Sequence, residues 1–528
     1  MSFTANDPSL LYVRARTAEA LGDTARSARL YASLSTINGN DWMLARRAVS
    51  SAIDAGSFDL AVLTARRIPA DQLALDGRLL LIADSLRRSQ LGEALTFVDD
   101  KTAEGDGGFV TPILRAWSEA AAGRDGLAPL STQAVSQGLL EPFADEQRAF
   151  LLLSQRKASQ AKPYIERALA SSGGRETRLR LAFAEGLRRA RDEAGAKALL
   201  VELAPEIRSK DVALDSPGIA ISTPAEAVAE LLAGIGGALT DNPDRSLPIS
   251  LLRAAHHASP KSSEVAVLLA LLLNRDGRNA EALAVLDPID ERDPFIGDVR
   301  DARLRLLLAA NRNADAVAFA RSTIASLGAR ARANDFGRLG DALRDAKDAA
   351  GAADAYGKAA ALAGAAGQDN RWTYLMLRAD QLESIGRWSE AKADLRAAIQ
   401  IQPDQPLLLN FLGYGQLERG ENLEEAEAMI RRALALRPDD ASITDSLGWA
   451  LFKRGRTDEA IETLRKAAAA DPVQSEIHEH LGDALYTKGR RLEARYSWRA
   501  ALITAEDQDA KRLQAKLDGG LSPETAAR

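Results

Sequence analysis

Apolar residues recur every three or four positions along most of the chain, which is the spacing of one face of an α-helix. Examples lie at 79–86, 150–152 and 179–183, where leucine, alanine and phenylalanine supply the apolar positions. Val, Ile and Thr do not gather in alternating runs, so strands have little support. The hydrophobic pattern therefore predicts an all-helical protein.

Near the C-terminus the helical pattern repeats at a fixed interval. Leu-Gly pairs stand at Leu412-Gly413, Leu447-Gly448 and Leu481-Gly482, so that the glycines are 35 and 34 residues apart. Each pair is followed by an alanine and a large apolar residue, and twice by a proline: Ala426, Ile430 and Pro438; Ala460, Leu464 and Pro472; Ala494 and Trp498. Glycine and alanine let two antiparallel helices approach, the large residues fill the seams, and proline ends the second helix.

This pattern resembles the tetratricopeptide repeat (TPR), whose unit of about 34 residues is a pair of helices. The resemblance implies an all-α, right-handed superhelical solenoid of antiparallel helix hairpins, TPR and TPR-like. It also implies a concave face that binds a peptide or a partner protein. Weaker copies extend upstream to about residue 260, and the remainder matches only by helical amphipathicity.

We expect four segments along this solenoid. They are degenerate TPR-like helical repeats over 1–214, divergent repeats over 215–370, well-formed repeats over 371–517 and a flexible tail over 518–528. The stretch 215–224, which is rich in proline and serine, is the expected boundary between two superhelical halves.

The closing run from Leu409 to Asp483 further resembles large bacterial TPR proteins that are exported, often as lipoproteins. Some members of that group deliver substrates to carboxy-terminal processing proteases in the periplasm. The resemblance implies a periplasmic or outer-membrane-associated adaptor if an N-terminal signal has been removed. The sequence departs from that group because it shows neither an export signal nor a lipobox cysteine, so a cytoplasmic location stays open.

Repeat positions 5 and 9 lie one helical turn apart and share a face. In the TPR family this face of the first helix lines the groove, and position 12 or 13 continues it. The corresponding residues are Asp380, Asn410, Tyr414, Asp445, Trp449, Phe452, Glu479, Asp483 and Tyr486. The Leu, Gly and Ala positions already account for hairpin packing, so these nine residues are expected to bind a partner. The alternative is a solvated face whose aromatic residues pack on the next hairpin.

The chemistry of these nine residues indicates what they would bind. The amide of Asn410 could hold a peptide backbone, and the aromatic rings would supply rigid contact area. The carboxylates would select basic or amine-bearing segments. A basic clamp for a C-terminal carboxylate is not favoured, because the groove positions other than Asn410 are acidic or aromatic.

Charge and composition narrow the function further. The net charge is -6, from 68 basic and 74 acidic residues that are interspersed, so no basic block favours nucleic acid. The sequence holds no cysteine, which excludes disulfides, thiol catalysis and thiolate metal sites. The most apolar stretch, at 265–273, is half of the roughly 18 residues that a membrane-spanning helix needs.

Motifs for catalysis or cofactor binding are missing from the sequence. No phosphate-binding glycine loop and no nucleophile elbow occur. The histidines at His256-His257 and His478-Glu479-His480 lack the i, i+4 spacing that metal chelation on a helix needs, so no metal or other cofactor is expected. We expect a non-catalytic interaction scaffold or adaptor. The alternative is a structural assembly factor that organises a multi-subunit complex in the cytoplasm.

Overall fold

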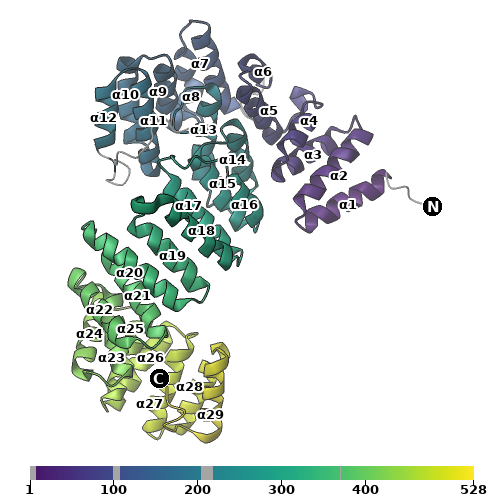
Figure 1. The fold of residues 1–528 in the computed structure, drawn as a ribbon. Coiled ribbons are helices and arrows are strands. Elements are labelled where there is room, and N and C mark those ends of the chain that lie inside the picture. Colours follow the sequence, from purple (N-terminus) through teal and green to yellow (C-terminus); the bar gives the residue numbers. More distant parts are fainter. Residues whose placement is uncertain (1–6, 99–107, 202, 204–217, 369, 528) are drawn as a thin grey trace. The chain divides into compact units, whose positions relative to one another are not determined.

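The computed structural model describes residues 7–98, 108–201, 203, 218–368 and 370–527. Within these ranges every regular element is an α-helix or a short 3-10 helix, as Figure 1 shows. The predicted all-α fold of paired helices is confirmed. The chain divides into two compact units, one ending at Asn311 and the other beginning at Arg312. None of the described helices is both long and apolar enough to cross a membrane.

The second unit consists of helices that pair with their neighbours in the sequence. These helices are α18 (Asn313–Leu327), α19 (Ala333–Asp345), α20 (Ala349–Ala365), α21 (Arg371–Ser384), α22 (Trp388–Ile401), α23 (Pro406–Glu418), α24 (Leu423–Leu436), α25 (Ala441–Lys453), α26 (Thr457–Ala470), α27 (Ser475–Thr487), α28 (Arg491–Thr504) and α29 (Asp507–Gly519). The hairpins α23–α24, α25–α26 and α27–α28 coincide with the three clearest repeats of the sequence.

Each of these hairpins is held by a glycine of the first helix against a large residue of the second. A Cβ atom on Gly448 would lie 2.6 Å from Cγ of Leu464, and one on Gly413 would lie 2.8 Å from Cγ1 of Ile430. Gly482 makes the same close approach to the ring of Trp498. Any larger residue at these glycines would push the two helices apart, which explains the fixed spacing of the Leu-Gly pairs.

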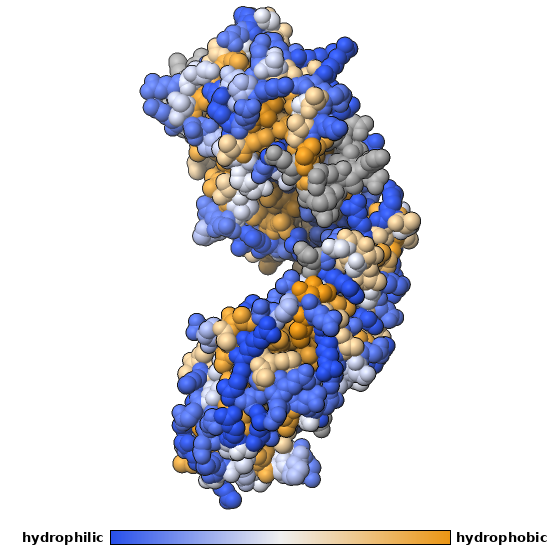
Figure 2. All heavy atoms as spheres, turned by 90° about the vertical axis from the view of Figure 1, so that its left-hand side faces the viewer, coloured by the Kyte–Doolittle hydropathy of each residue, from blue (hydrophilic) through white to orange (hydrophobic). Residues whose placement is uncertain are grey.

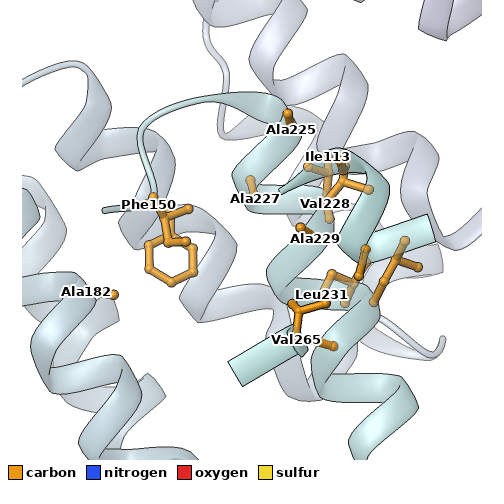
Figure 3. Packing of buried hydrophobic residues seen from close by; sticks show 14 of the residues in the cluster. Ile113, Phe150, Ala182, Ala225, Ala227, Val228, Ala229, Leu231 and Val265 are labelled. Atoms are coloured by element: carbon orange, nitrogen blue, oxygen red, sulfur yellow. The ribbon is translucent and has the colours of Figure 1, made fainter. Parts of the chain in front are cut away.

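The first unit also consists of helices. They are α1 (Pro8–Ala20), α2 (Thr24–Ile37), α3 (Trp42–Asp54), α4 (Phe58–Ala65), α5 (Leu75–Arg87), α6 (Leu91–Thr96), α7 (Thr111–Ala121), α8 (Gln133–Ser136), α9 (Ala144–Ser154), α10 (Ala158–Ala170), α11 (Glu176–Arg189), α12 (Glu193–Val201), α13 (Pro224–Ala238), α14 (Ser246–Ala258), α15 (Ser263–Arg275), α16 (Asn279–Val285) and α17 (Ile296–Ala309). Figure 3 shows part of their shared core, a cluster that includes Ile113 of α7, Phe150 of α9, Val228 and Leu231 of α13, and Val265 of α15.

The helices of the first unit do not stack strictly in chain order. α14 packs on α5 and also contacts α3. Nη2 of Arg253 in α14 donates 2.5 Å to the backbone oxygen of Asp54, at the end of α3. His257 in the same helix lies 3.3 Å from Oδ1 of Asp84 in α5. The chain therefore returns to its N-terminal helices after about 200 residues, which the repeat pattern does not indicate.

A buried ionic cluster joins α9, α11, α13 and α15. Arg175 approaches three carboxylates, at 3.0 Å from Glu146, 2.7 Å from Glu230 and 3.7 Å from Glu264. Arg178 lies 2.9 Å from Glu230 and 3.4 Å from Glu264. Burial raises the pKa of both Glu146 and Glu264 to about 7, whereas the two arginines outweigh burial at Glu230 and lower its pKa. We call these five residues the ionic cluster.

The expected boundary at 215–224 lies inside the first unit. Residues 215–217 fall outside the described ranges, but Ile219 is buried, and Arg178 donates to the backbone oxygens of Gly218 and Ile219. The division between the compact units lies instead between Asn311 and Arg312. The four-segment division of the sequence stays a prediction.

The described part of the expected flexible tail is packed. The backbone N–H of Ala527 donates 2.9 Å to Oδ2 of Asp483 in α27, and Ala527 is buried. Leu521 packs on the same core. The tail therefore covers part of α27, although its glycines and proline favoured fraying.

Candidate functional site

The residues expected at the groove lie on the first helices of the hairpins. Repeat positions 5 and 9 lie on one side of α21, α23, α25 and α27, and we call this side the groove face. Its residues are Asp380 in α21, Asn410 and Tyr414 in α23, Asp445 and Trp449 in α25, and Glu479 and Asp483 in α27.

Asp445 is buried and pairs with a histidine of the next repeat. Nδ1 of His480 lies 2.9 Å from Oδ2 and 3.1 Å from Oδ1 of Asp445. Burial alone would lower the pKa of His480, but the adjacent Asp445 carboxylate outweighs burial and raises that pKa to about 9. The histidine is therefore cationic at neutral pH, and the pair joins α25 to α27.

Trp449 lies flat against the same histidine. The ring centroids of Trp449 and His480 are 4.1 Å apart and their planes differ by 12°. Nε1 of Trp449 donates 2.6 Å to Glu418 of α23, and Phe452 stacks on the indole at 5.0 Å. The Lys453 ammonium lies 4.8 Å from the indole centroid. Trp449 is buried and connects three successive first helices.

Glu479 and Asp483 are covered by α29. Nζ of the fully buried Lys516 lies 2.6 Å from Glu479 and 2.7 Å from Asp483. Arg512 donates two hydrogen bonds, of 2.8 and 2.7 Å, to the Glu479 carboxylate. Burial would raise the pKa of Glu479, but Arg512 and Lys516 outweigh it and lower that pKa. Nε1 of Trp498 also donates to Asp483, at 2.9 Å.

The expectation that hairpin packing does not need the nine predicted residues is therefore wrong for four of them: Asp445, Trp449, Glu479 and Asp483. A carboxylate can occupy the interior when the next helix supplies a cation to pair with it. Phe452 and Tyr486 are half-buried, and Tyr486 packs on Trp498 with the ring centroids 5.3 Å apart. A binding role for any of these six residues stays a prediction.

Tyr414 is half-buried and bridges two repeats. Its hydroxyl donates 2.6 Å to Oε1 of Glu476 in α27. Burial, followed by the carboxylates of Glu476 and Glu418, raises the pKa of Tyr414 well above its usual range. The hydroxyl thus stays protonated and remains a donor.

The groove face is open at α21 and α23. Asp380 is exposed, and its carboxylate accepts a hydrogen bond only from the neighbouring Gln381 among the described residues. Oδ1 of Asn410 is buried and has no hydrogen-bond partner in the described part of the chain. Leu407, three residues before Asn410, is 45% exposed. An ion pair of 3.0 Å between Glu383 and Arg419 holds α21 beside α23.

The difference between Asn410 and its repeat equivalents has a clear cause. Asp445 is paired because His480 stands at the adjacent position of the next repeat. The counterpart of His480 one repeat earlier is Ser446, whose short hydroxyl donates to the backbone of Ser442 in its own helix. No residue of α25 therefore forms a hydrogen bond with Oδ1 of Asn410. We call Asp380, Leu407, Asn410 and Tyr414 the open site.

The sequence reasoning missed His480, Arg512, Lys516 and Trp498 as partners of the predicted residues. One signal was present. Lys516 stands 34 residues after Gly482, where each repeat has a glycine facing its second helix. In place of that glycine, the long side chain of Lys516 reaches back to Glu479 and Asp483 of α27.

The first unit holds a separate hollow of about 610 Å³ between α3, α5 and α14. Its lining combines polar residues such as Arg46, Arg47, Asp54 and Asp76 with the apolar residues Leu75, Leu79, Leu247 and Leu251. Because it is formed by helices far apart in the sequence, no local pattern predicted it.

A family model described as Tetratricopeptide repeat matches residues 376–441 and 446–510. These two segments are tetratricopeptide repeats. We call residues 376–510 the TPR region. It extends from within α21 to just beyond α28, and it contains both the open site and the internally paired residues of the groove face. No curated protein sequence matches the chain.

Solved structures similar to this chain include other repeat proteins. The crystal structure of the APC/C hetero-tetramer Cut9-Hcn1 matches with 15% identity over 98% of this chain and 97% of that chain, with a TM-score of 0.37. A crystal structure of MamA matches with 26% identity over 33% of this chain and 97% of that chain, with a TM-score of 0.27. YrrB, a TPR protein with an unusual peptide-binding site, matches with 19% identity over 37% of this chain and 97% of that chain, with a TM-score of 0.28.

Proposed function

We propose that the protein is a non-catalytic scaffold that binds a peptide segment of a partner protein at the open site. The observation that supports this most directly is the side-chain oxygen of Asn410, which is buried and has no hydrogen-bond partner in the described part of the chain. A buried acceptor without a partner costs free energy, about 1–3 kcal/mol, which a bound ligand would offset. An amide can also donate and accept at once, as a peptide backbone requires.

The neighbours of Asn410 suit a segment that carries a basic residue. Tyr414 lies one turn along the same helix face and offers a ring beside the amide. Leu407 supplies an apolar contact on the other side of Asn410. The exposed carboxylate of Asp380 would pair with a lysine, an arginine or an amine of the ligand. The carboxylates further along the groove face are already paired with cations of this chain. A basic residue of the ligand would therefore bind at Asp380 of α21.

A capture experiment with full-length variants tests this proposal. We would compare the proteins that co-purify from the native host with the wild type, with Asn410→Ala and with Asp380→Ala. Lys466→Ala on the outer side of α26, where Lys466 is exposed, is the matched control. Partners lost with both groove variants and retained with the control support the open site. A set of partners unchanged by both groove variants contradicts it.

We also propose the narrower role that the family resemblance suggests, an adaptor in the bacterial envelope that serves a carboxy-terminal processing protease. Its support is the resemblance of the run from Leu409 to Asp483 to exported TPR proteins. The test is to express the native gene with its own N-terminus, to fractionate the cells and to identify co-purifying proteins by mass spectrometry. Recovery of a processing protease with an envelope-located protein supports this role. Cytosolic recovery with subunits of one complex supports the assembly-factor alternative.

A further inference from the structure

The outer side of α28 exposes a row of large apolar side chains. Leu492, Tyr496 and Ile503 are 67%, 60% and 83% exposed. Offsets of four and eleven residues bring them within about 40° of one another around a helix of 3.6 residues per turn. Val473 is 67% exposed and lies at the end of this row, because the hydroxyl of Thr504 donates 2.7 Å to its backbone oxygen.

The preceding repeat shows that this row is not a requirement of the fold. The residues 34 positions earlier are Asp439, Asp458, Glu462 and Ala469, all of them solvated. The same outward positions thus carry acidic or small residues in α26 and large apolar residues in α28. On the face drawn in Figure 2, hydrophilic residues are interspersed with hydrophobic ones. A contiguous group of exposed apolar residues is a mark of an interaction site.

Two arginines accompany the apolar row. Arg495 and Arg499 are exposed, stand one turn apart, and form no ion pair with any residue of the described chain. Arg490, by contrast, is paired with Glu493 at 2.5 Å, and Arg465 of α26 is paired with the same carboxylate at 2.9 Å. The two arginines of α28 without an ion pair, Arg495 and Arg499, therefore lie beside the exposed apolar row.

We infer that this surface binds an acidic, amphipathic helical segment of a partner protein. We call it the α28 surface, formed by Val473, Leu492, Arg495, Tyr496, Arg499 and Ile503. From Leu492 to Ile503 the helix rises about 16 Å, which corresponds to about three turns. A partner helix of similar length can place apolar residues on the row and carboxylates beside the two arginines. This site lies on the opposite helix of the hairpin from the groove face, so it is independent of the proposed function.

Charge favours a protein segment over the other candidate occupants. Glu506 and Asp507 follow Ile503 closely, and an anionic bilayer would repel them, whereas a protein segment can match charges individually. A second copy of α28 would bring two pairs of unpaired arginines together, which like-charge repulsion opposes.

Photo-crosslinking in the native host tests this inference. The full chain would carry p-benzoylphenylalanine in place of Tyr496, and the matched control would carry it in place of Glu462, its counterpart on α26. After irradiation, the cross-linked peptides are identified by mass spectrometry. We expect position 496, and not position 462, to capture one protein segment that combines acidic residues with apolar residues at helical spacing. We expect the yield to fall at least about tenfold in R495E/R499E and to persist in R495K/R499K.

Several outcomes would overturn the inference. They are cross-links to lipid, to a second copy of the chain, to a segment without acidic residues, or to no molecule at all. Equal capture by positions 462 and 496 would also overturn it. Thermal unfolding of R495E/R499E serves as the control for folding, and because both arginines are exposed and unpaired, its midpoint should match that of the wild type. Binding of a synthetic peptide with the captured sequence to the purified protein would then measure the affinity of the α28 surface directly.

Discussion

The hydroxyl of Tyr414 donates a hydrogen bond of 2.6 Å to the carboxylate of Glu476, two repeats further along the chain. This bond joins α23 to α27 and passes over α25 between them. It marks the place where the groove face changes from an open surface, at α21 and α23, to one paired internally.

Removal of that hydroxyl should weaken the contact between repeats. We expect Tyr414→Phe to lower the free energy of unfolding by about 0.5–1.5 kcal/mol, because one solvent-exposed hydrogen bond is lost and the ring is kept. Urea unfolding of the full chain, followed by circular dichroism, measures the change. Tyr496→Phe is the matched control, since Tyr496 is exposed, and it should leave the unfolding midpoint unchanged.

Loss of the buried lysine of α29 should be far more damaging. Lys516→Met leaves the carboxylates of Glu479 and Asp483 with one cation fewer in the interior. We expect the free energy of unfolding to fall by about 3–5 kcal/mol, the cost of breaking a buried ion pair from one side. The exposed Lys511→Met is the control. Adding Asp483→Asn to Lys516→Met should recover part of the loss, and a further loss would contradict this account.

The pair of His480 and Asp445 should make stability depend on pH in the alkaline range. The folded pKa of His480 is about 9, above the value of about 6.5 in unfolded chains. Its contribution is therefore complete below about pH 6.5 and is lost as the pH rises through 9. We expect the stability difference between wild type and His480→Gln, measured by chemical denaturation from pH 6 to 10, to shrink by up to about 3 kcal/mol over this range. A difference that does not vary with pH would show that the histidine is neutral in the folded protein.

The ionic cluster should act in the opposite sense. The pKa of Glu264 is about 7 in the folded protein and near 4.5 in the unfolded chain. The free energy of unfolding therefore falls as the pH rises from 4.5 to 7 and Glu264 becomes charged in the interior. We expect Glu264→Gln to raise the free energy of unfolding at pH 8 by about 1–3 kcal/mol, and by less at pH 5.

Glu230→Gln supplies the contrast, because the pKa of Glu230 is lowered by Arg175 and Arg178. This variant should destabilise the first unit at pH 8. Stabilisation by both variants would show that the cluster as a whole is poorly paired.

The hairpins of the TPR region could be predicted because their contacts lie within one repeat. Gly448 must be small where Leu464 crosses it, and that requirement recurs in register. The partners of the groove acids could not be predicted in the same way. Asp445 and Glu479 have the sequence pattern of solvated carboxylates, and only the next helix, 33 to 35 residues away, shows that a cation reaches them.

The packing of the first unit could not be predicted from the sequence either. Periodicity shows which side of α5 is apolar, but it does not show which helix will cover that side. The covering helix is α14, and the hydrogen bond between Arg253 and Asp54 crosses 199 residues.

That long-range contact also sets an order for folding during synthesis. The apolar side of α5 cannot be covered until α14 has left the ribosome, so about 170 residues of nascent chain must wait with part of their core incomplete. The hairpins of the TPR region need no such delay, because each can close on its predecessor as it emerges. The protein would thus depend most on chaperones during synthesis of the segment between α5 and α14, or when the chain is truncated within that segment.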